Sequence, residues 1–315
     1  MENAIVSVEH LTHKYEDHKA LDDVSFEVSE SEIFGFLGPN GGGKTTIFKI
    51  LSTLIIPTIG KVKLNGNDVV QRPSDARKHI GVVFQSPSLD VKLTVKENLR
   101  FQGLLHGLHG SLLSFRIDEV LAQLKLGDRA HSIVEKLSGG QQRRVEIGKG
   151  LLHRPEILIL DEPSTGLDPG ARKDLWEYLL QLQQDHRVTI IVTSHILDEA
   201  ENCHRLAILD KGHIVALGKP EDLKREIGGD VINITMIEPA KMIGLMRAKF
   251  GGEPVVLEGV IRIEKENGHQ FVPQMIEAFP GQVSSISISK PTLEDVFIHR
   301  TGHRLWQDST NGEAS

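Results

Sequence analysis

A glycine-rich loop between an apolar segment and a helical pattern constrains the fold of this chain most strongly. Residues 33–37 read Ile-Phe-Gly-Phe-Leu, as in a buried strand, and residues 38–46 continue as Gly-Pro-Asn-Gly-Gly-Gly-Lys-Thr-Thr. The run matches G-x-x-x-x-G-K-[ST] in the strand–loop–helix setting that this pattern requires. Backbone N–H groups of such a loop turn inward around an anion, and the dipole of the next helix favours negative charge. The loop therefore predicts a site for nucleotide phosphates; a glycine-rich turn without a ligand is the alternative.

Two side chains of this loop have expected roles in phosphate chemistry. Lys44 would reach the β- and γ-phosphates, and the hydroxyl of Thr45 would bind Mg²⁺. The candidate nucleotide-binding residues of the loop are Gly38, Pro39, Asn40, Gly41, Gly42, Gly43, Lys44, Thr45 and Thr46.

An acidic pair follows a second apolar segment. Ile157–Leu160 is a short run of buried-strand type, and Asp161 and Glu162 come directly after it. Open α/β sheets place their ligands at the C-terminal edge of their strands. We therefore expect Asp161 to hold Mg²⁺ through a coordinated water and Glu162 to polarise an attacking water as the general base. Without the upstream loop, a cap for the next loop would be the better interpretation of this pair.

Composition sets outer limits on function. The 315 residues suit about two domains, and 39% hydrophobic with 25% charged residues is typical of a globular protein. A net charge of −7 argues against nucleic-acid binding through a basic surface. Cys203, the only cysteine, fits a reducing compartment and is expected to be buried. Six histidines form no convincing metal-ligand cluster and are expected at the surface: His13, His18, His106, His109, His131 and His153.

No segment of the sequence has the features of a membrane span. The N-terminal residues lack the basic start and apolar stretch of a signal peptide. The longest apolar runs, such as Ile157–Leu160 and Ile190–Val192, are far shorter than the ~20 residues that cross a bilayer. Any membrane association is therefore expected to come through a partner.

About the first 220 residues alternate β-branched runs with helical patterns, which predicts a largely parallel α/β sheet. The first two and the last two expected strands would be antiparallel additions, because short turns such as residues 210–212 leave no room for a crossover helix. Residues of about 86–150 predict a helical subdomain, with helices at Val95–His106, at Leu113–Leu124 and from Ser138. The expected strands are Ile5–Val8, Val24–Val28, Ile33–Leu37, Lys61–Leu64, Gly81–Phe84, Ile157–Leu160, Thr189–Thr193, Arg205–Leu209 and His213–Leu217.

A break at Ile227–Asp230 precedes a change in the order of elements. The expected order beyond it is strand–helix–strand–strand–helix–strand, the order of a ferredoxin-like split unit. These elements are Val231–Ile237, Ala240–Phe250, Pro254–Leu257, Val260–Glu264, Phe271–Phe279 and Val283–Ser287, with a last helix at Thr292–His299. We expect an N-terminal domain over 1–228, a small α+β domain over 229–306 and a flexible tail over 307–315.

The segment Leu137–Gln141, Leu-Ser-Gly-Gly-Gln, lies between the phosphate loop and the acidic pair. Ser138 is expected to cap the following helix, and Gly139 and Gly140 would let the backbone approach a phosphate closely. Alone, Ser-Gly-Gly-Gln is a common helix start. In this position and order, the segment resembles the signature sequence of the ABC (ATP-binding cassette) family.

Four further elements resemble motifs of that family, in family order. Tyr15 resembles the aromatic residue that stacks on adenine, and Gln85 resembles the glutamine that reports Mg²⁺ and the γ-phosphate to a membrane subunit. Residues Ser164–Pro169 resemble the loop that crosses the dimer interface, and Thr193–His195 resembles the switch whose histidine contacts the γ-phosphate. Three of them have plainer alternatives: Tyr15 as a half-buried aromatic residue, Gln85 as a polar loop residue and His195 as a residue at a helix start.

The resemblance implies an α/β fold of the P-loop NTPase, ABC cassette type, with a mixed sheet core, an antiparallel β subdomain and a helical subdomain. ATP and Mg²⁺ would be the cofactors. The implied metal residues are Thr45, Gln85 and Asp161, and the implied catalytic residues are Lys44, Gln85, Glu162 and His195. In the family, Ser138, Gly139, Gly140 and Gln141 of a second subunit close the γ-phosphate site, which implies a head-to-tail homodimer. The residues alone leave open whether these groups act in trans or in cis.

One position departs from the family pattern. Many relatives carry alanine or serine where this chain has Gly42. The change adds backbone freedom but removes no hydrogen-bond donor, so we expect nucleotide binding to survive.

A transporter subunit is favoured over other ABC classes. Translation factors of this type usually carry two cassettes, and repair ATPases insert a long coiled coil; this chain has one cassette and an insert of ordinary size. A catalytically inactive binding module is disfavoured, because no catalytic position is lost. Leu93–Leu99 resembles the part that grips a permease. Lys290–Ile298 resembles the end of daunorubicin-exporter-type ATPases, although a terminal helix packing into a small core explains it equally well.

These resemblances imply an ATPase that is bound to a separate membrane permease at the cytoplasmic side of the membrane. They favour export over import, with a drug, antibiotic, lipid or similar cargo. No nucleic-acid partner is expected for such a subunit, because its net charge is −7. A soluble ABC ATPase of translation or DNA repair is the alternative.

Overall fold

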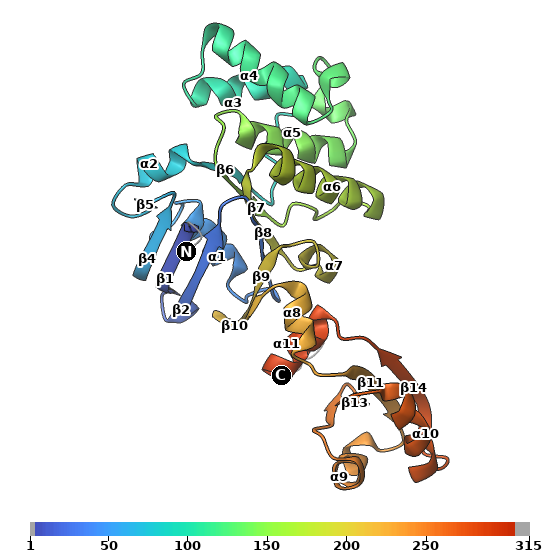
Figure 1. The fold of residues 1–315 in the computed structure, drawn as a ribbon. Coiled ribbons are helices and arrows are strands. Elements are labelled where there is room, and N and C mark those ends of the chain that lie inside the picture. The colour runs from blue at the N-terminus through green and yellow to red at the C-terminus, as the bar shows by residue number, and fades with distance from the viewer. Residues whose placement is uncertain (1–3, 306–315) are drawn as a thin grey trace, which may run out of the picture. The chain divides into compact units, whose positions relative to one another are not determined.

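The computed structural model describes residues 4–305, so the expected tail over 307–315 lies outside the described residues. The chain divides into two compact units, of which the first ends at Ile214 (Figure 1). The second unit therefore starts earlier than the expected boundary at 228. Helix α8 (Pro220–Arg225) belongs to the second unit because it packs against α11 (Leu293–Thr301), and Arg300 of α11 pairs with Glu226.

A six-stranded sheet forms the centre of the first unit, and the division at Ile214 falls within its outermost strand, β10 (His213–Gly218). In spatial order the sheet consists of β10, β9 (Arg205–Asp210), β3 (Ile33–Leu37), β8 (Thr189–Ser194), β7 (Ile157–Asp161) and β6 (Ile80–Val83). β3 pairs in parallel with β8 and β9, and β7 pairs in parallel with β6 and β8. The expectation that the strand at 205–209 is an antiparallel addition is wrong. β9 joins the parallel sheet because the chain crosses over from β8 through the short helix α7 (Leu197–Ala200).

A second sheet of this unit is antiparallel and has the spatial order β2 (His18–Ser29), β1 (Ala4–Tyr15), β4 (Ile59–Leu64) and β5 (Asn67–Asp68). This confirms the antiparallel pairing expected for the first two strands. β1 and β2 have 12 residues each and are longer than predicted, because their pairing continues through polar residues as far as Tyr15 and His18. The sequence patterns do not predict β5 or the short helix α2 (Pro73–Lys78).

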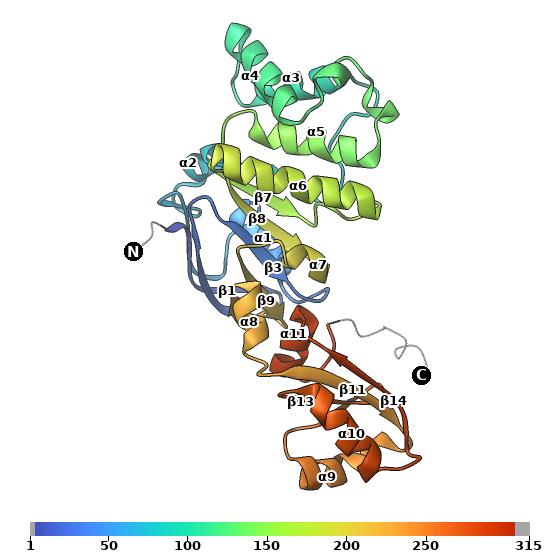
Figure 2. The ribbon, with the colours of Figure 1, turned by 45° about the vertical axis from the view of Figure 1, so that its right-hand side comes forward.

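The predicted helical subdomain lies between β6 and β7 and contains α3 (Val95–Leu105), α4 (Gly110–Gln123) and α5 (Gly139–Leu151) (Figures 1 and 2). Two of these helices begin where predicted, because Thr94 and Ser138 form capping boxes with the third residue of each helix. Helices α1 (Lys44–Leu51) and α6 (Pro169–His186) follow β3 and β7. Within residues 4–305, no helix combines the length and apolar character of a membrane span.

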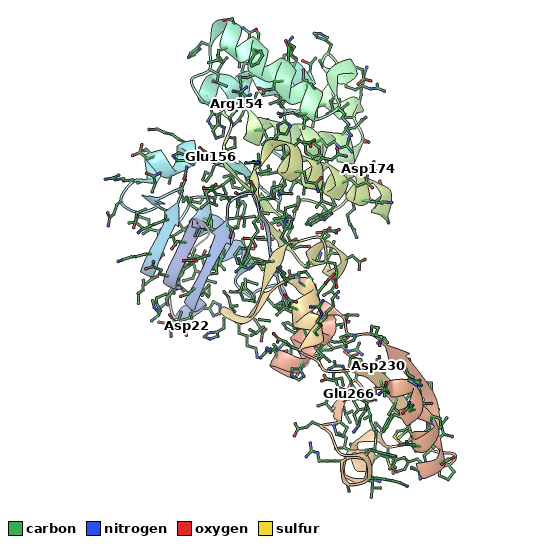
Figure 3. All side chains as sticks on the ribbon, in the orientation of Figure 1. Asp22, Arg154, Glu156, Asp174, Asp230 and Glu266 are labelled. Atoms are coloured by element: carbon green, nitrogen blue, oxygen red, sulfur yellow. The ribbon has the colours of Figure 1, made fainter. Side chains whose placement is uncertain are left out.

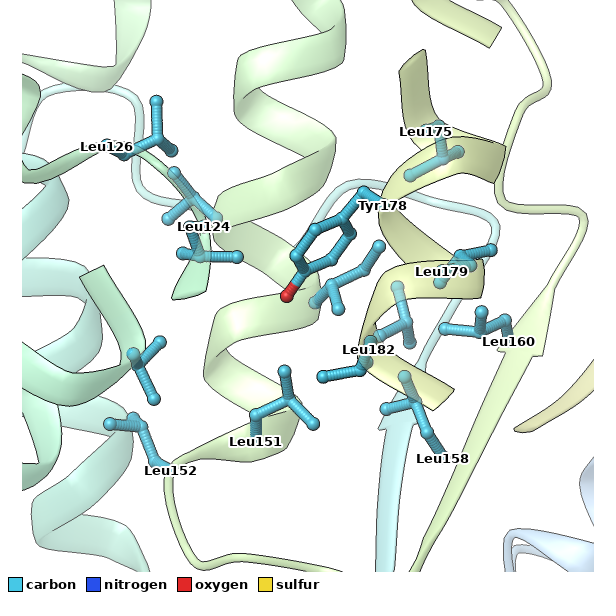
Figure 4. Close-up of a cluster of buried hydrophobic side chains, with 14 of the residues drawn as sticks. Leu124, Leu126, Leu151, Leu152, Leu158, Leu160, Leu175, Tyr178, Leu179 and Leu182 are labelled. Atoms are coloured by element: carbon cyan, nitrogen blue, oxygen red, sulfur yellow. The ribbon is translucent and has the colours of Figure 1, made fainter. Parts of the chain in front are cut away.

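Two apolar clusters cover opposite faces of the central sheet. Leu158 and Leu160 of β7 lie in one cluster with Tyr178 of α6 (Figure 4). Ile157 and Ile159 of the same strand lie in the other cluster. The alternation follows from the two-residue period of a strand. It explains why residues 157–160 of this strand are all apolar, since both of its faces are buried.

Two expectations about single residues have opposite outcomes. Cys203 is buried as expected: a Cβ added to Gly35 would lie 2.7 Å from its Sγ. Burial raises the pKa of the Cys203 thiol. His13, which was expected at the surface, is buried in β1, with its ring centroid 4.6 Å from that of Tyr15.

The second unit contains an antiparallel sheet with the spatial order β12 (Val255–Leu257), β13 (Val260–Lys265), β11 (Asp230–Met236) and β14 (Val283–Ser289). Helices α9 (Pro239–Phe250) and α10 (Gly268–Ala278) join β11 to β12 and β13 to β14. This is the predicted ferredoxin-like topology. Buried residues of its core include Ile232, Ile234, Met246, Phe271 and Met275.

Candidate functional site

The phosphate loop joins β3 to α1 and requires glycine at two crowded positions. A Cβ at Gly38 would lie 2.3 Å from the carbonyl oxygen of Leu209. Gly43 has φ of 111°, and a Cβ there would lie 2.8 Å from Cδ2 of Leu21. Only glycine adopts that backbone and fits that space. The inward-turned backbone of the loop therefore depends on Gly38 and Gly43, because a Cβ at either position would clash with its neighbours.

Lys44 is the buried cation of the loop. Its Nζ donates hydrogen bonds to the carbonyl oxygens of Gly38 (2.7 Å) and Pro39 (3.0 Å). Burial lowers the pKa of Lys44, while the negative charges of Glu162 and Asp161 oppose that shift. The ammonium group is thus held at the loop and faces the acidic end of β7.

A cavity of about 220 Å³ lies beside the loop. Tyr15, at the end of β1, forms part of its wall and is 42% exposed. Thr45 is also exposed there. The lining residues are Tyr15, His18, Ala20, Asn40, Gly41, Gly43, Lys44, Thr45, Thr46 and Glu162. The structure therefore brings the predicted adenine, phosphate and water-activating residues to one cavity.

A larger cavity, of about 430 Å³, lies at the opposite ends of β7 and β8. Several of its charged residues are paired within the chain. Arg154 donates to Glu119 over 2.9 Å, and Glu156 lies 3.0 Å from Nδ1 of His79 (Arg154 and Glu156 are labelled in Figure 3). This cavity contains none of the residues that the sequence singled out for chemistry.

The acidic pair is held by Thr193 of the neighbouring strand β8. The Thr193 hydroxyl donates to Oδ1 of Asp161 over 2.6 Å and accepts from the backbone N–H of Glu162 over 3.0 Å. Burial raises the pKa of Asp161, and the charge of Glu162 adds to this, while the Thr193 hydrogen bond and Lys44 oppose it. Glu162 has a φ of 42°, the left-handed region that non-glycine residues rarely adopt.

Three side chains converge on a single oxygen of Glu162. Oε2 accepts from Nε2 of Gln85 over 3.1 Å and from the hydroxyl of Thr165 over 3.2 Å, and it lies 3.0 Å from Nδ1 of His195. These residues come from segments that are far apart in sequence. The structure thus places the predicted glutamine and histidine on the predicted base.

The signature residues lie at the exposed start of α5. The Ser138 hydroxyl accepts from the N–H of Gln141 over 3.3 Å, and the Gln141 side chain accepts from the N–H of Ser138 over 3.0 Å. A Cβ at Gly140 would lie 3.1 Å from that of Ala171 in α6, so the helix tip packs closely against that helix. None of the described residues 138–141 lines the phosphate-loop cavity.

Arg143, which no sequence motif singles out, lies beneath this site. The buried guanidinium donates to the carbonyl oxygens of Pro163 (2.7 Å), Phe84 (2.7 Å) and Asp161 (3.3 Å), and to Glu146 (2.5 Å). All three carbonyls lie beside candidate catalytic residues. The available signal was an opposite charge three residues on, which is the spacing of a helical pair.

Two further side chains of α5 hold the segment that follows Gln85. Glu146 accepts from the backbone N–H of Ser88 over 2.5 Å, and Nζ of Lys149 donates to the Ser88 carbonyl over 2.7 Å. Burial lowers the pKa of Lys149, and Glu146 opposes that shift. The signature helix is therefore tied to the loop of Gln85 within one chain.

Comparison with known proteins identifies the family. The model of the ABC transporter family matches residues 21–165. The daunorubicin resistance ATP-binding protein DrrA3 of Streptomyces coeruleorubidus is 33% identical over 320 residues, covering 96% of this chain and 97% of that protein. The chain belongs to the ABC transporter family. The Nod factor export ATP-binding protein I of Cupriavidus metallidurans, another ABC relative, is 40% identical over 310 residues, covering 96% of this chain and 99% of that protein.

Solved ABC structures share the fold. The cbiO1 protein of Clostridium perfringens, part of the ABC transporter complex cbiONQ, has a TM-score of 0.67 at 26% identity and covers 79% of this chain and 96% of that chain. A dimeric ATP-binding cassette in a post-hydrolysis state with ADP and Pi has a TM-score of 0.60 at 28% identity, covering 68% and 98%. The predicted α/β ABC fold is confirmed. The chain is an ATP-binding ATPase subunit of an ABC transporter.

Proposed function

We propose that this ABC subunit hydrolyses MgATP between two copies of itself and thereby drives a separate membrane permease, in the direction of export. The observation that carries the chemistry is the convergence of Gln85, Thr165 and His195 on one oxygen of Glu162. A carboxylate held in this way beside a phosphate loop is placed to orient an attacking water.

The phosphates would lie in the cavity beside Lys44, with the loop N–H groups and the start of α1 around them. Lys44 would exchange its bonds to the Gly38 and Pro39 carbonyls for bonds to the β- and γ-phosphates. Tyr15 would stack on the adenine at the other side of the cavity. Phosphoryl transfer depends mainly on positioning and on charge neutralisation, and these groups supply both.

The oxygen donors of Thr45, Asp161 and Gln85 fit Mg²⁺, which prefers carboxylate, hydroxyl and amide oxygens. When bound, Mg²⁺ would neutralise charge that develops on the phosphates. Asp161 is prepared for this role because Thr193 fixes its carboxylate. Glu162 would take the proton of the attacking water, while His195 holds that carboxylate and contacts the γ-phosphate.

A second copy of the chain would complete the site. Pockets that bury most of a small ligand measure about 300–1,000 Å³, and the cavity of about 220 Å³ covers only part of a nucleotide. At the tip of α5, the N–H groups of Gly139 and Gly140 lie in the first helical turn, where N–H groups have no partner within the helix. In the proposed two-fold dimer, that tip would lie over the partner's γ-phosphate. A related cassette of known structure is dimeric with ADP and Pi.

The permease would dock on the helical subdomain. Phe101, Leu104 and Leu105 share one face of α3 and are exposed, and so are Leu112 and Phe115 of α4. Such apolar surface is typical of protein interfaces. Relatives named for daunorubicin resistance and Nod factor export support export as the direction. The subunit would then be peripheral at the cytoplasmic side of the membrane.

Glu162→Gln tests this proposal. The amide keeps the size of the side chain but cannot act as a base, so we expect MgATP binding to persist and kcat to fall at least ~100-fold. ATP-dependent dimers should accumulate, measured by size-exclusion chromatography. A cysteine pair at Asn40 and Ser138 should crosslink two chains only with MgATP. Asn40 is chosen because Gly41 has a φ of 79° that strains any other residue.

The matched control is Glu177→Gln, an exposed glutamate on α6, which should hydrolyse ATP at the wild-type rate. Buried Cys203 should not react. Normal turnover by Glu162→Gln would remove Glu162 as the base. Crosslinks confined to single chains would remove the dimer.

A further inference from the structure

Glu199 of α7 is a buried carboxylate that joins two functional segments. It is 1% exposed. The hydroxyl of Ser164 donates to its Oε1, and the hydroxyl of Ser194 donates to its Oε2 over 2.6 Å. Ser164 begins the loop after the base, and Ser194 precedes His195. One side chain therefore connects the Ser164–Pro169 loop with the histidine switch.

The same carboxylate also reaches the far end of that loop. Nε of Arg172, in the first turn of α6, lies 3.7 Å from Oε1 of Glu199. Between the two contacts, Asp168 caps α6 by accepting from the N–H of Ala171 over 2.9 Å. The Ser164–Pro169 loop is thus held at its start and just beyond its end by a single group.

These contacts close a ring around the catalytic pair. The Ser194 hydroxyl, which donates to Glu199, also accepts from the N–H of Ile196 over 2.9 Å, so the backbone on both sides of His195 is fixed. Nδ1 of His195 lies 3.0 Å from Oε2 of Glu162. Glu162 is two residues before Ser164, and this short piece of chain completes the ring.

The chemistry of a buried carboxylate explains why the ring holds its shape. An ionised carboxylate only accepts hydrogen bonds, so both serine hydroxyls must point toward it. Removing such a charge from water is unfavourable unless donors and an opposite charge surround it. Ser164, Ser194 and Arg172 provide these groups. Rotation of either serine would remove one of the two hydroxyl donors from the buried charge.

We propose that Glu199 is a positioning residue that couples the Ser164–Pro169 loop to the Glu162–His195 pair. It does not line the nucleotide cavity, so it acts through the two serines and does not touch substrate. The inference rests on the proposed function, in which this loop meets the second subunit. Binding of that subunit to the loop then affects the position of Glu162 and His195 through the contacts of Ser164, Glu199 and Ser194.

Glu199→Gln tests the coupling. Glutamine matches the size but has one acceptor oxygen and no attraction for Arg172. Displacement of reacting groups by about 1 Å costs on the order of 100-fold, so we expect kcat for ATP to fall ~10- to 100-fold. KM and the equilibrium affinity for a non-hydrolysable MgATP analogue should stay within about twofold. ATP-dependent dimers should still form.

A double-mutant cycle separates positioning from a general structural role. Ser194→Ala should lower kcat by a similar factor, and the Glu199→Gln/Ser194→Ala pair should be no worse than either change, because both break the same ring. Additive losses would overturn the proposal. If Glu199→Gln does not fold, Ser164→Ala and Ser194→Ala are compared in its place, and wild-type kcat in both would also overturn it.

The matched control is Asp198→Asn, an exposed carboxylate on the same helix, which should keep the wild-type kcat. A wild-type kcat in Glu199→Gln would overturn the role proposed for Glu199. With normal hydrolysis by the unaltered chain, it would leave the proposed function in place. Failure of the proposed function has a different signature: full turnover in Glu162→Gln.

Discussion

Thr193 serves two acidic residues with one hydroxyl. It donates to Asp161 and accepts from the N–H of Glu162, so the candidate metal ligand and the candidate base share a fixed support. Sequence patterns placed Thr193 in the segment that ends at His195 but assigned it no role. Such a role depends on β7 and β8 being neighbours, with Asp161 paired to Thr193 in register. Local sequence motifs cannot predict this pairing, because β7 and β8 are separated in sequence by α6 and become neighbours only in the folded sheet.

His153 shows how burial changes a titrating residue. Its ring stacks on that of His106 with centroids 4.0 Å apart, and its Nε2 lies 2.9 Å from the carbonyl oxygen of Ile80. Burial, and then the neighbouring His106, lower the pKa of His153 to about 4. His153 therefore takes up a proton less readily in the folded protein than in the unfolded chain, where the pKa of histidine is about 6.5.

The sign of the pH dependence follows. Stability from neutral His153 is fully present above about pH 6.5 and is lost as the pH falls toward about 4. Between pH 7.5 and pH 5 we expect a loss of about 1–2 kcal/mol from this residue, allowing for the water that reaches the ring. Urea denaturation at the two pH values measures it.

His153→Gln should remove that part of the pH dependence, since glutamine does not titrate and still offers an N–H to Ile80. His109→Gln, which changes an exposed histidine, should keep the wild-type dependence. Equal pH dependence in the wild type and in His153→Gln would contradict this assignment.

At the scale of elements, α5 carries more than its signature end. Its start was predicted from Ser138, because capping is a local interaction between the first residues of a helix. The sequence did not predict the buried charges of this helix, because Arg143 and Arg144 are adjacent arginines and only Arg143 is buried. Helical periodicity favours apolar residues on the buried face, so a buried ion pair goes against the pattern.

Arg143→Ala should be strongly destabilising. It leaves three carbonyl oxygens and the buried Glu146 without their donor, and breaking a buried pair in this way costs about 3–5 kcal/mol. Arg144→Ala is the control. Arg144 lies 6.0 Å from the Tyr178 ring and 4.0 Å from the Asp174 carboxylate, and should cost no more than about 1 kcal/mol. Urea titration of both variants decides; equal small losses would mean that Arg143 does not support the site.

At the scale of the whole molecule, element order was predictable, whereas the neighbours of strands within the parallel sheet were not. The second unit follows the predicted ferredoxin-like order, since each of its strands pairs as that topology requires. In the first unit, β9 lies beside β3 although β8 precedes it in sequence. Crossover connections decide such neighbours, and turn lengths alone misplace them, as they did for the strand at 205–209.

The two compact units predict two thermal transitions. A non-hydrolysable MgATP analogue at about 100 times its Kd should stabilise the nucleotide-binding unit by about 2.7 kcal/mol and leave the other transition in place. Met246→Ala, at a fully buried position of the second unit, should lower the free energy of unfolding of that unit by about 2–5 kcal/mol and so lower the temperature of the other transition. Calorimetry measures both; a single transition that moves with both changes would show that the units unfold together.

The left-handed backbone of Glu162 has a consequence for variation at this position. A non-glycine residue in that conformation costs about 1–2 kcal/mol, which glycine avoids. Selection for heat resistance alone would therefore favour glycine here, and with it an ATPase that no longer turns over. On the proposed mechanism, glutamate at this position lowers the stability of the fold but is required for ATP hydrolysis.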